Sequence, residues 1–412
     1  MAAAEEFVLK NGTTVVYEYI PNTQIASIHA WINVGSVSET PKLNGISHFL
    51  EHILFKGTKN YGPDEIDNVV ESRGGLMNAG TSKDYTNYHI TLPAEHAETA
   101  FKVISDMVFF ASFITDEIEK EKPVVVQEIQ RKYDNPTYDM WKEAMELLYA
   151  GTPYAMEIIG TEENVLSFTP ENLKNYYRSH YHPENITLVA VGDLPLERVK
   201  EYAEKYFSHK PEVTANKGYK NVWKPTLKEP IFRSFEREVA QDYILVGWQV
   251  PAVAKDAPVY EVLSEVLSGG DFSLLNQELK YKKAVVVAVS SGEMLYKYAG
   301  AYMVHMVANP GEAELATAAL KEALKQVMED GVSEDELRKA KNRLISRTVF
   351  RQEKSSSEAS EIGYSYTLEL KDYYNTYKGK IEAIKAADVA FLAKQIFSSP
   401  AVTVKTVPLT KK

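Results

Sequence analysis

The chain has 412 residues, of which 44% are hydrophobic and 25% are charged, with a formal net charge of −11 and no cysteine. The lack of cysteine excludes disulfides and thiol chemistry. The acidic balance argues against nucleic acid and anionic membranes as partners and weakly favours basic peptides. The sequence has no apolar run of about 18 residues, so no membrane span is expected, and its length suggests two or three domains.

The first six residues lack the basic region and the apolar core of a signal peptide. We therefore expect a cytoplasmic protein, or a periplasmic one if a leader has been removed. β-Branched and aromatic residues then predict three strands, at 7–10, 13–19 and 26–34. Helices are expected further along at 63–73, 94–111 and 170–181, and strands at 85–92 and 186–191.

Residues 45–57 form a short apolar segment that predicts a helix, with Gly57 as its C-cap. His48 and His52 are four residues apart, so their imidazoles emerge from one face of this helix, one turn apart. Two neutral imidazoles make half of a zinc site, and Glu51 beside them can accept a proton from a water that the metal acidifies. The pattern is H-x-x-E-H, the reverse of the commoner H-E-x-x-H. The alternative is a pair of surface histidines on an amphipathic helix.

Glu128 is the best candidate for a third ligand, because a catalytic zinc site usually has three from the protein. Pro123 suits a first helical turn, which places Glu128 about one and a half turns inside the helix. If the helix extends back to Glu121, that carboxylate shares a face with Glu128 and could orient a ligand from behind. Thr115 is expected to cap the helical segment that carries both glutamates. The alternative for both is a solvated acidic helix start, where carboxylates are favoured.

The H-x-x-E-H segment followed by Glu128 resembles the pitrilysin/insulinase family of zinc peptidases, the inverzincins. The likeness is to the short two-domain bacterial members and to the β subunit of mitochondrial processing peptidase. It covers nearly the whole chain and includes residues 78–81, 84–88, 181–188 and 191–193. The resemblance implies that His48, His52 and Glu128 bind one Zn²⁺, that Glu51 is the general base and that Glu121 supports the site.

The second half of the chain repeats blocks of the first half at a period of about 216 residues. The blocks pair 168–173 and 186–189 with 384–389 and 402–405, 114–117 with 332–335, and 50–57 with 263–270. Helices and strands occur in blocks in each half, so the predicted class is α+β. We expect a zinc-bearing domain at 1–208, a linker at 209–230 and a homologous ligand-free domain at 231–412. The family resemblance implies that two such domains face each other around a chamber.

The metal motif is not repeated in the second half. His48, Glu51 and His52 fall on Glu261, Ser264 and Glu265, and Glu128 falls on Ser346. The second domain is therefore expected to keep the shape and lack the ligands. In the block at 332–335, Ser333 and Glu336 are expected to form a capping box.

Two other segments suggest binding. Asn78, Ala79 and Gly80 have little side-chain chemistry, but small residues allow a peptide to approach and add as a strand. The sequence alone favours a turn there, whereas the family resemblance favours peptide binding. His180 and His182 would share one face of a strand as a metal pair, but no third ligand is apparent nearby, so a structural role is preferred.

The chain departs from the family in its ligand-free domain. Family peptidases place an Arg and a later Tyr there, facing the zinc, to hold the substrate backbone and the developing oxyanion. Here Lys280 and Val287 stand at those positions, and neither lysine nor valine can replace the guanidinium or the hydroxyl. Tyr281, if it lay on a strand, would point to the opposite face, whereas Tyr296 or Tyr298 would serve if the alignment is shifted. We therefore expect the chain to be the zinc-bearing half of a heterodimer, with a homologous subunit that carries the Arg and the Tyr.

The expected function is a zinc endopeptidase that cleaves unfolded peptides. Glu51 would accept the proton of the attacking water and pass it to the leaving amine. One alternative is a non-catalytic structural or assembly subunit of the same family. Another is a metal-dependent hydrolase of a different bond.

Overall fold

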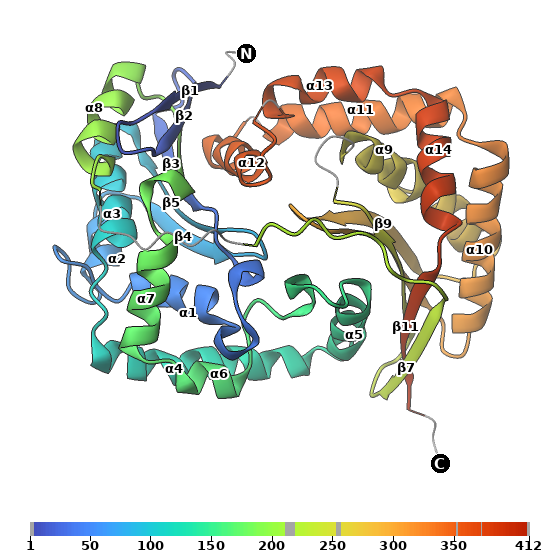
Figure 1. Ribbon diagram of the computed structural model, residues 1–412. Coiled ribbons are helices and arrows are strands. Elements are labelled where there is room, and N and C mark those ends of the chain that lie inside the picture. Colours follow the sequence, from blue (N-terminus) through green and yellow to red (C-terminus); the bar gives the residue numbers. More distant parts are fainter. Residues whose placement is uncertain (1–3, 211–218, 253–256, 352, 372, 410–412) are drawn as a thin grey trace. The chain divides into compact units, whose positions relative to one another are not determined.

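The computed structural model describes residues 4–210, 219–252, 257–351, 353–371 and 373–409 (Figure 1). The chain divides into two compact units that exchange segments. The first unit comprises Met1–Gln130, Met156–Lys220 and Arg351–Asn375; the second comprises Arg131–Ala155, Asn221–Phe350 and Thr376–Lys412. Each unit contains one sheet and several helices, so the predicted α+β class is confirmed.

The first unit is built on a six-stranded sheet of order β1-β2-β6-β3-β5-β4. Its strands are β1 (Glu5–Val8), β2 (Thr14–Tyr19), β3 (Ile25–Ile32), β4 (Leu76–Thr81), β5 (Thr86–Pro93) and β6 (Ile186–Gly192). Only β2 and β6 run parallel; the other pairs are antiparallel. On β5 the four alternating side chains of Thr86, Tyr88, Ile90 and Leu92 are all buried, as the sequence predicts. β4 is an edge strand, because it pairs with β5 alone among the described residues.

Alternation along β3 divides the first unit into two layers of packing. Ile28, Ala30 and Ile32 point into the main core, on which α1 (Ile46–Leu54), α3 (Ala97–Phe110) and α8 (Leu196–Phe207) pack. The core also takes in α2 (Glu65–Glu71), α4 (Thr115–Arg131), α6 (Glu162–Ser167) and α7 (Pro170–His180). Trp31 points to the opposite face, which α12 (Ser355–Thr367) covers through Ala359 and Ile362.

The helix α12 belongs to the sequence of the second half but to the packing of the first unit. A buried polar contact holds it there together with the start of α13 (Tyr373–Ala383): the Tyr374 hydroxyl lies between the carboxyl groups of Glu18 on β2 and Glu358 on α12. Glu18 and Glu358 are both buried. A phenol has one proton and can donate to one carboxylate only, and burial raises the pKa of both carboxyl groups.

The second unit repeats the topology of the first. Its five-stranded sheet has the order β7-β11-β8-β10-β9, formed by β7 (Ile231–Arg237), β8 (Asp242–Val250), β9 (Ala288–Leu295), β10 (Gly300–Ala308) and β11 (Ala401–Pro408). This order matches β2-β6-β3-β5-β4, and the parallel pair β7–β11 matches β2–β6. The sequence repeat is therefore a structural repeat. The predicted capping box is also present, since Ser333 and Glu336 bond reciprocally at the start of α11 (Glu334–Arg351).

Both faces of the second sheet are covered. Gly247 on β8 faces Leu148 of α5 (Tyr138–Leu148), whereas the adjacent Trp248 packs on Phe397 of α14 (Ala386–Phe397). The unit also holds α9 (Ala257–Ser268) and α10 (Ala313–Asp330). Helix α5 comes from the first half of the sequence, so it is the counterpart of α12 in the exchange. The contiguous boundaries 1–208 and 231–412 stay a prediction. Of the predicted linker, residues 211–218 lie outside the described ones, and 219–230 contain no helix or strand.

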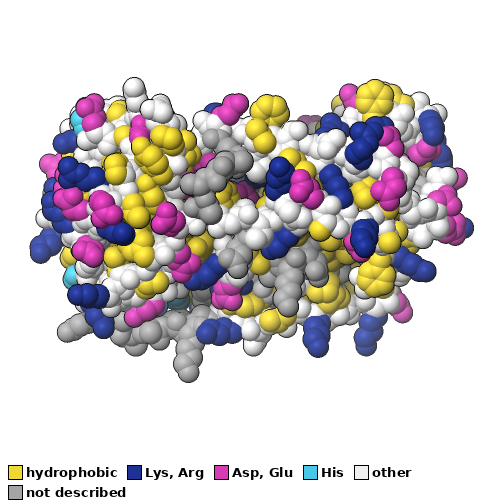
Figure 2. All heavy atoms as spheres, turned by 90° about the horizontal axis from the view of Figure 1, so that it is seen from above, with side chains coloured by type: hydrophobic (Ala, Val, Ile, Leu, Met, Phe, Trp, Pro, Cys, Tyr) yellow, Lys and Arg dark blue, Asp and Glu magenta, His cyan; other side chains and the backbone are white. Residues whose placement is uncertain are grey.

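Charged side chains of both signs are mixed on the described surface. On the face in Figure 2, Lys and Arg side chains alternate with Asp and Glu side chains and do not gather into a patch of one sign. Among the described residues, no helix combines the length and the apolar character needed to cross a membrane.

Candidate metal centre

Helix α1 carries the H-x-x-E-H motif on a largely buried element. Phe49, Leu50, Ile53 and Leu54 anchor it in the core, while His48 and His52 keep 13% and 23% of their side-chain surface exposed. The helix ends at Leu54 with Phe55 as its C-cap, so the prediction that Gly57 caps it is wrong. Gly57 instead takes a φ of +129° just beyond the end, where the chain turns away.

Helix α4 supplies two glutamates to the same place. It runs without a break from Thr115 to Arg131, so the prediction that Pro123 lies in a first turn is wrong. Proline inside a helix removes one N–H and crowds the carbonyl four residues earlier. Pro123 lies on the exposed side of α4, where water can satisfy that carbonyl. Because the helix continues, Glu121 and Glu128 lie two turns apart on one face.

Three predicted ligands converge. One ligand atom from each of His48, His52 and Glu128 lies within 4.8 Å of the others. Glu128 Oε1 is 3.7 Å from His48 Nε2, and its Oε2 is 3.7 Å from His52 Nε2. Two ligand atoms that are each about 2.0–2.1 Å from a tetrahedral zinc lie about 3.4 Å apart, so small side-chain shifts would bring these atoms to a common ion. Among the described residues, no other His, Asp or Glu cluster of this kind is present.

Glu121 fixes the orientation of His52. Its Oε1 is 2.8 Å from His52 Nδ1 and its Oε2 is 2.8 Å from Lys56 Nζ. A carboxylate only accepts hydrogen bonds, so Nδ1 carries the proton and the Nε2 lone pair is left for a cation. Burial would raise the pKa of Glu121, but the bonds from His52 and Lys56 lower it below its usual value. Glu121 is buried, so the solvated reading of this residue is wrong.

The carboxylates around His52 favour a bound cation. Burial would lower the pKa of His52, but the Glu121 hydrogen bond and the charges of Glu51, Glu121 and Glu128 raise it. An imidazole surrounded by three carboxylates is thus stabilised in contact with positive charge, whether a proton or a metal ion. The donor set of two imidazoles and a carboxylate suits zinc.

Glu51 lies beside this cluster, close to His52 and Glu128. Burial raises the pKa of its carboxyl group, an effect that the Thr81 hydrogen bond and nearby His52 partly oppose. Thr81 ends β4 and donates its hydroxyl to Glu51 Oε2. Sequence reasoning missed Thr81 and Lys56. Lys56 continues the four-residue spacing of His48 and His52, a signal that could have revealed it.

Asn78, Ala79 and Gly80 lie within β4 itself, so the interpretation of these residues as a turn is wrong. They pair with β5 through the register Asn78↔His89 and Gly80↔Asn87. β4 has no second partner strand among the described residues, and its Ala79 N–H bonds to the Asn78 side-chain oxygen at 2.9 Å. Strand addition requires a free edge of this kind, and a peptide would have to replace that side-chain bond.

The histidines His180 and His182 do not form a metal pair on a strand. His180 is the last residue of α7, where its buried ring packs on Tyr176 at 4.2 Å and Nδ1 is 2.9 Å from the Tyr176 carbonyl. His182 Nδ1 lies 3.1 Å from Glu184. The preferred structural role therefore agrees with their surroundings.

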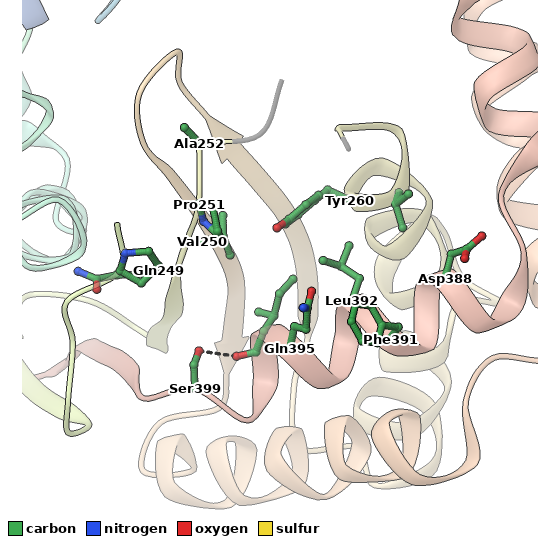
Figure 3. A pocket seen from close by; sticks show the side chains of 13 residues that line it. Gln249, Val250, Pro251, Ala252, Tyr260, Asp388, Phe391, Leu392, Gln395 and Ser399 are labelled. Carbon is green, nitrogen blue, oxygen red and sulfur yellow. Dashed lines mark hydrogen bonds between the residues drawn. The ribbon is translucent and has the colours of Figure 1, made fainter. Parts of the chain in front are cut away.

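A separate hollow with a volume of about 940 Å³ lies within the second unit (Figure 3). It is lined by the end of β8, by α9 and by α14, including Val250, Tyr260 and Leu392. Among the described residues that line it, Asp388 alone is charged, and its carboxylate accepts the Lys385 N–H at the start of α14. The hollow therefore offers no cluster of titratable groups for chemistry.

Two imidazoles one turn apart on α1 and a glutamate that converges on them from α4 are a donor set that suits a divalent metal ion such as zinc. Comparison with known proteins agrees. The family model of insulinase (peptidase family M16) matches residues 14–162, and that of the peptidase M16 inactive domain matches residues 167–344. The chain belongs to the insulinase family of peptidases, M16, and zinc is the cofactor of that family.

Relatives that are named as proteases or as a peptidase subunit match 86% or more of the chain. The chain is 29% identical over 402 residues to an uncharacterized zinc protease, YmxG, of Bacillus subtilis strain 168, with 96% of each chain covered. It is 26% identical over 375 residues to the mitochondrial-processing peptidase subunit beta of Saccharomyces cerevisiae, covering 86% of this chain and 80% of that one. The crystal structure of a protease from Helicobacter pylori matches with a TM-score of 0.88 at 26% identity, covering 99% and 100% of the two chains.

Proposed function

We propose that this chain is a zinc-dependent endopeptidase for unfolded peptides and the catalytic subunit of a heterodimer. The observation that carries the enzymatic part is the convergence of His48, His52 and Glu128 at distances of 3.7 Å, with Glu121 holding His52 from behind. These residues would hold one Zn²⁺. When bound there, zinc supplies a Lewis acid that polarises a carbonyl oxygen and brings the pKa of a water close to neutrality.

Glu51 is the proton carrier in this proposal. A carboxylate one residue before His52, with its pKa raised by burial, can accept the proton of the attacking water and return it to the leaving amine. Thr81 donates to Oε2, so Oε1 is the oxygen that would accept the proton in this proposal. Proton transfer of this kind typically contributes about 10²–10⁴-fold to the rate.

The edge strand β4 is the proposed peptide-binding surface. An extended peptide could add beside Asn78, Ala79 and Gly80 through main-chain hydrogen bonds, which bind a backbone without regard to its sequence. Because Thr81 follows these residues directly and contacts Glu51, a peptide in that register would lead its backbone toward the general base.

The heterodimer rests on Lys280 and Val287. Lys280 lies in the π-helical segment η7 (Asn276–Lys282), and Val287 directly precedes β9. Tyr281 does not lie on a strand: it belongs to η7 and donates its hydroxyl to Asp271. Tyr296 is a poor substitute, because β9 separates it from Val287 by about 30 Å of extended chain and its ring stacks on Tyr154 at 4.8 Å.

The test of the enzymatic part combines elemental analysis with peptide cleavage. We expect one zinc per chain and cleavage of a mixed peptide library by a preparation that includes the partner. Glu51→Gln should keep the zinc and lose about 10²–10⁴-fold in turnover, whereas Glu71→Gln, at an exposed carboxylate of α2, should match the wild type. A Glu51→Gln enzyme with more than about a tenth of wild-type turnover would show that Glu51 is not the base.

The heterodimer is tested by mixing. Alone, the chain should bind zinc yet cleave peptides poorly, and a homologous chain with the Arg and Tyr in place should restore turnover. Full activity in a preparation that mass spectrometry shows to contain only this chain would refute this part. Zinc at well below one ion per chain would instead favour a non-catalytic subunit.

A further inference from the structure

Glu39 closes the N-terminal turn of the helix that carries the metal motif. Its Oε2 accepts the backbone N–H of Gly45 at 2.8 Å and the side-chain amide of Asn44 at 2.9 Å, and its Oε1 accepts the N–H of Ser47 at 2.8 Å. Three donors therefore meet one carboxylate: the N–H of Ser47 in the first turn of α1, the N–H of its N-cap Gly45 and the amide of Asn44. Ser47 directly precedes His48.

The N-cap residue of helix α1 does not close this end with a side chain of its own. Its N-cap is Gly45, which has no side chain to accept a hydrogen bond and takes a φ of +97°. A Cβ at Gly45 would lie 2.5 Å from the carbonyl oxygen of Ile159, so a Ser or Asp could not take over the cap. The first N–H groups of a helix are unpaired within the helix, and here they are buried, because Ile46 and Ser47 are almost fully shielded from water.

The carboxylate of Glu39 is itself buried, with 6% of its surface exposed. Burial raises its pKa, whereas the N–H groups of Ser47 and Gly45 and the Asn44 amide oppose that rise. The buried Lys83 supplies a nearby positive charge, and burial lowers the pKa of its amine to about 8. An anion at a helix N-terminus also interacts favourably with the helix dipole, so these groups offset part of the cost of burying the Glu39 carboxylate.

A carboxylate that accepts the N–H groups of both Gly45 and Ser47 restrains the rotation and the axial position of α1. A helix with its side chains has a radius of about 5–6 Å, so a rotation of about 10° moves an imidazole nitrogen by about 1 Å. Metal and catalytic constellations need positions held within about 0.5 Å. The apolar side chains of α1 anchor it in the core, and the bonds of Glu39 add a directional restraint at the end of the helix nearest His48.

We propose that Glu39 is a positioning residue of the metal centre, setting the orientation of His48, Glu51 and His52 through the first turn of α1. The inference rests on the proposed zinc site and adds a residue that touches neither the ion nor a ligand. In Glu39→Gln, the amide nitrogen is a donor and would face a donor, so at least one N–H would be left unpaired.

The direct readout is zinc affinity, measured by competition with a chelator. Glu39→Gln is expected to weaken zinc binding by about 10–100-fold, the range for residues that orient metal ligands. The visible spectrum of the Co²⁺-substituted variant should also change, because its absorption reports the ligand geometry. With peptide substrates, kcat should fall while KM stays, since β4 is unaffected.

A matched control comes from the second unit. Asp242 on β8 is likewise a buried carboxylate that accepts the first N–H of a distant helix, that of Ala313 in α10, at 2.9 Å. Asp242→Asn should lower the melting temperature and leave zinc affinity and the Co²⁺ spectrum unchanged. If a folded Glu39→Gln variant behaves in the same way, Glu39 has only a structural role and the proposal is overturned.

Two further results also bear on the role of Glu39. If Glu39→Gln does not fold, Glu39→Asp replaces it: the shorter side chain keeps the charge but cannot reach both N–H groups, and wild-type zinc affinity with a wild-type Co²⁺ spectrum would overturn the proposal. The metal measurements need no peptidase activity. A wild-type protein that binds zinc but cleaves no peptide would therefore sink the proposed function and leave the role of Glu39 open to the same test.

Discussion

Replacing Gly363 by alanine should loosen α12 from the sheet of the first unit. A Cβ at this position would lie 2.0 Å from Trp31 Nε1, 2.2 Å from its Cε2 and 2.5 Å from its Cδ1. Carbon contacts are optimal at about 3.5–4.0 Å, so either the helix or the indole must move by about 1.5 Å. Trp31 cannot move cheaply, since it is 3% exposed and packs against Tyr85 with ring centroids 4.8 Å apart.

Two opposing terms set the magnitude. Alanine is favoured over glycine inside a helix by about 1 kcal/mol, whereas overpacking a close interface costs about 1–3 kcal/mol. Gly363→Ala should therefore range from neutral to about 2 kcal/mol destabilising. Gly379 of α13 isolates the first term, because a Cβ there would meet nothing within 4 Å. Gly379→Ala should be stabilising, by about 0.5–1 kcal/mol.

The difference between the two variants measures the packing cost alone. Urea denaturation followed by circular dichroism gives the two changes in unfolding free energy, and hydrogen exchange read by mass spectrometry localises them. We expect faster exchange over residues 355–367 in Gly363→Ala and no such change in Gly379→Ala. If both variants shift stability by the same amount in the same direction, the close contact between α12 and Trp31 does not limit packing.

Three further outcomes follow from the site and from the buried acids. Glu128→Gln should abolish most zinc binding in a chelator competition, whereas Glu121→Gln should cost only about 10–100-fold; equal occupancy of Glu128→Gln and wild type would contradict the ligand assignment. Lys56→Met should weaken zinc binding within that range and Lys56→Arg should restore it, since Lys56 holds Glu121 against His52; unchanged affinity in Lys56→Met would contradict this. Burial raises the pKa of Glu358 to about 7, so the folded protein binds this proton more tightly than the unfolded chain, and the contribution to stability is full below about pH 4.3 and is lost as the pH rises through about 7. Glu358→Gln should therefore gain stability relative to wild type over that pH interval, by up to a few kcal/mol, and a pH-independent difference in urea titrations would refute the raised pKa.

The sequence predicts much of the centre because the motif is local. His48 and His52 share a helix, and helical spacing alone places their imidazoles together. Glu128 required a guess about a second helix, and the structure brings it to the same place although Pro123 does not begin that helix. The roles of these residues in chemistry stay predictions, whereas the family and its zinc cofactor are confirmed by the comparisons.

The residues that support the centre could not be predicted from the sequence, for a different reason. Glu39, Thr81 and Lys56 act through hydrogen bonds whose partners are fixed by the path of the chain between elements. A glutamate before a helix is ordinary in sequence, and only the left-handed Gly45 reveals that α1 lacks a cap of its own. Sequence periodicity carries no information about such contacts.

The exchange of helices between the halves was also invisible in the sequence. Helix α5 follows α4 in the first half of the sequence but packs on the sheet of the second unit. Helix α12 follows α11, the counterpart of α4 in the second half, but packs on the sheet of the first unit. The contacts are complementary in size: Trp31 meets Gly363 in the first unit, whereas Gly247 meets Leu148 in the second. A small residue opposite a large one permits close approach on either sheet, and neither residue alone predicts it.

The two units also differ in the hydrogen bond that joins the edge strand to α1 in the first unit and to its counterpart α9 in the second. In the first unit Thr81 on the edge strand β4 donates to Glu51 on α1. In the second unit the groups are reversed, since Ser264 on α9 donates to Glu293 on the edge strand β9 at 2.7 Å. The hydrogen bond between helix and edge strand is thus kept. The carboxyl group has moved from the helix to the strand, where burial raises its pKa to about 7.

In the second half the counterparts of the metal ligands have different partners. Its counterpart of His52 is Glu265, which forms an ion pair with Arg347 on α11, one residue beyond the counterpart of Glu128. A guanidinium therefore supplies the positive charge at the point where, in the first unit, an imidazole and a carboxylate approach to 3.7 Å. Glu265 is buried and Arg347 is largely exposed, so the guanidinium supplies the charge that this buried carboxylate needs while it stays in contact with water. The shared backbone frame accordingly holds a cation-binding set in one half and a closed ion pair in the other.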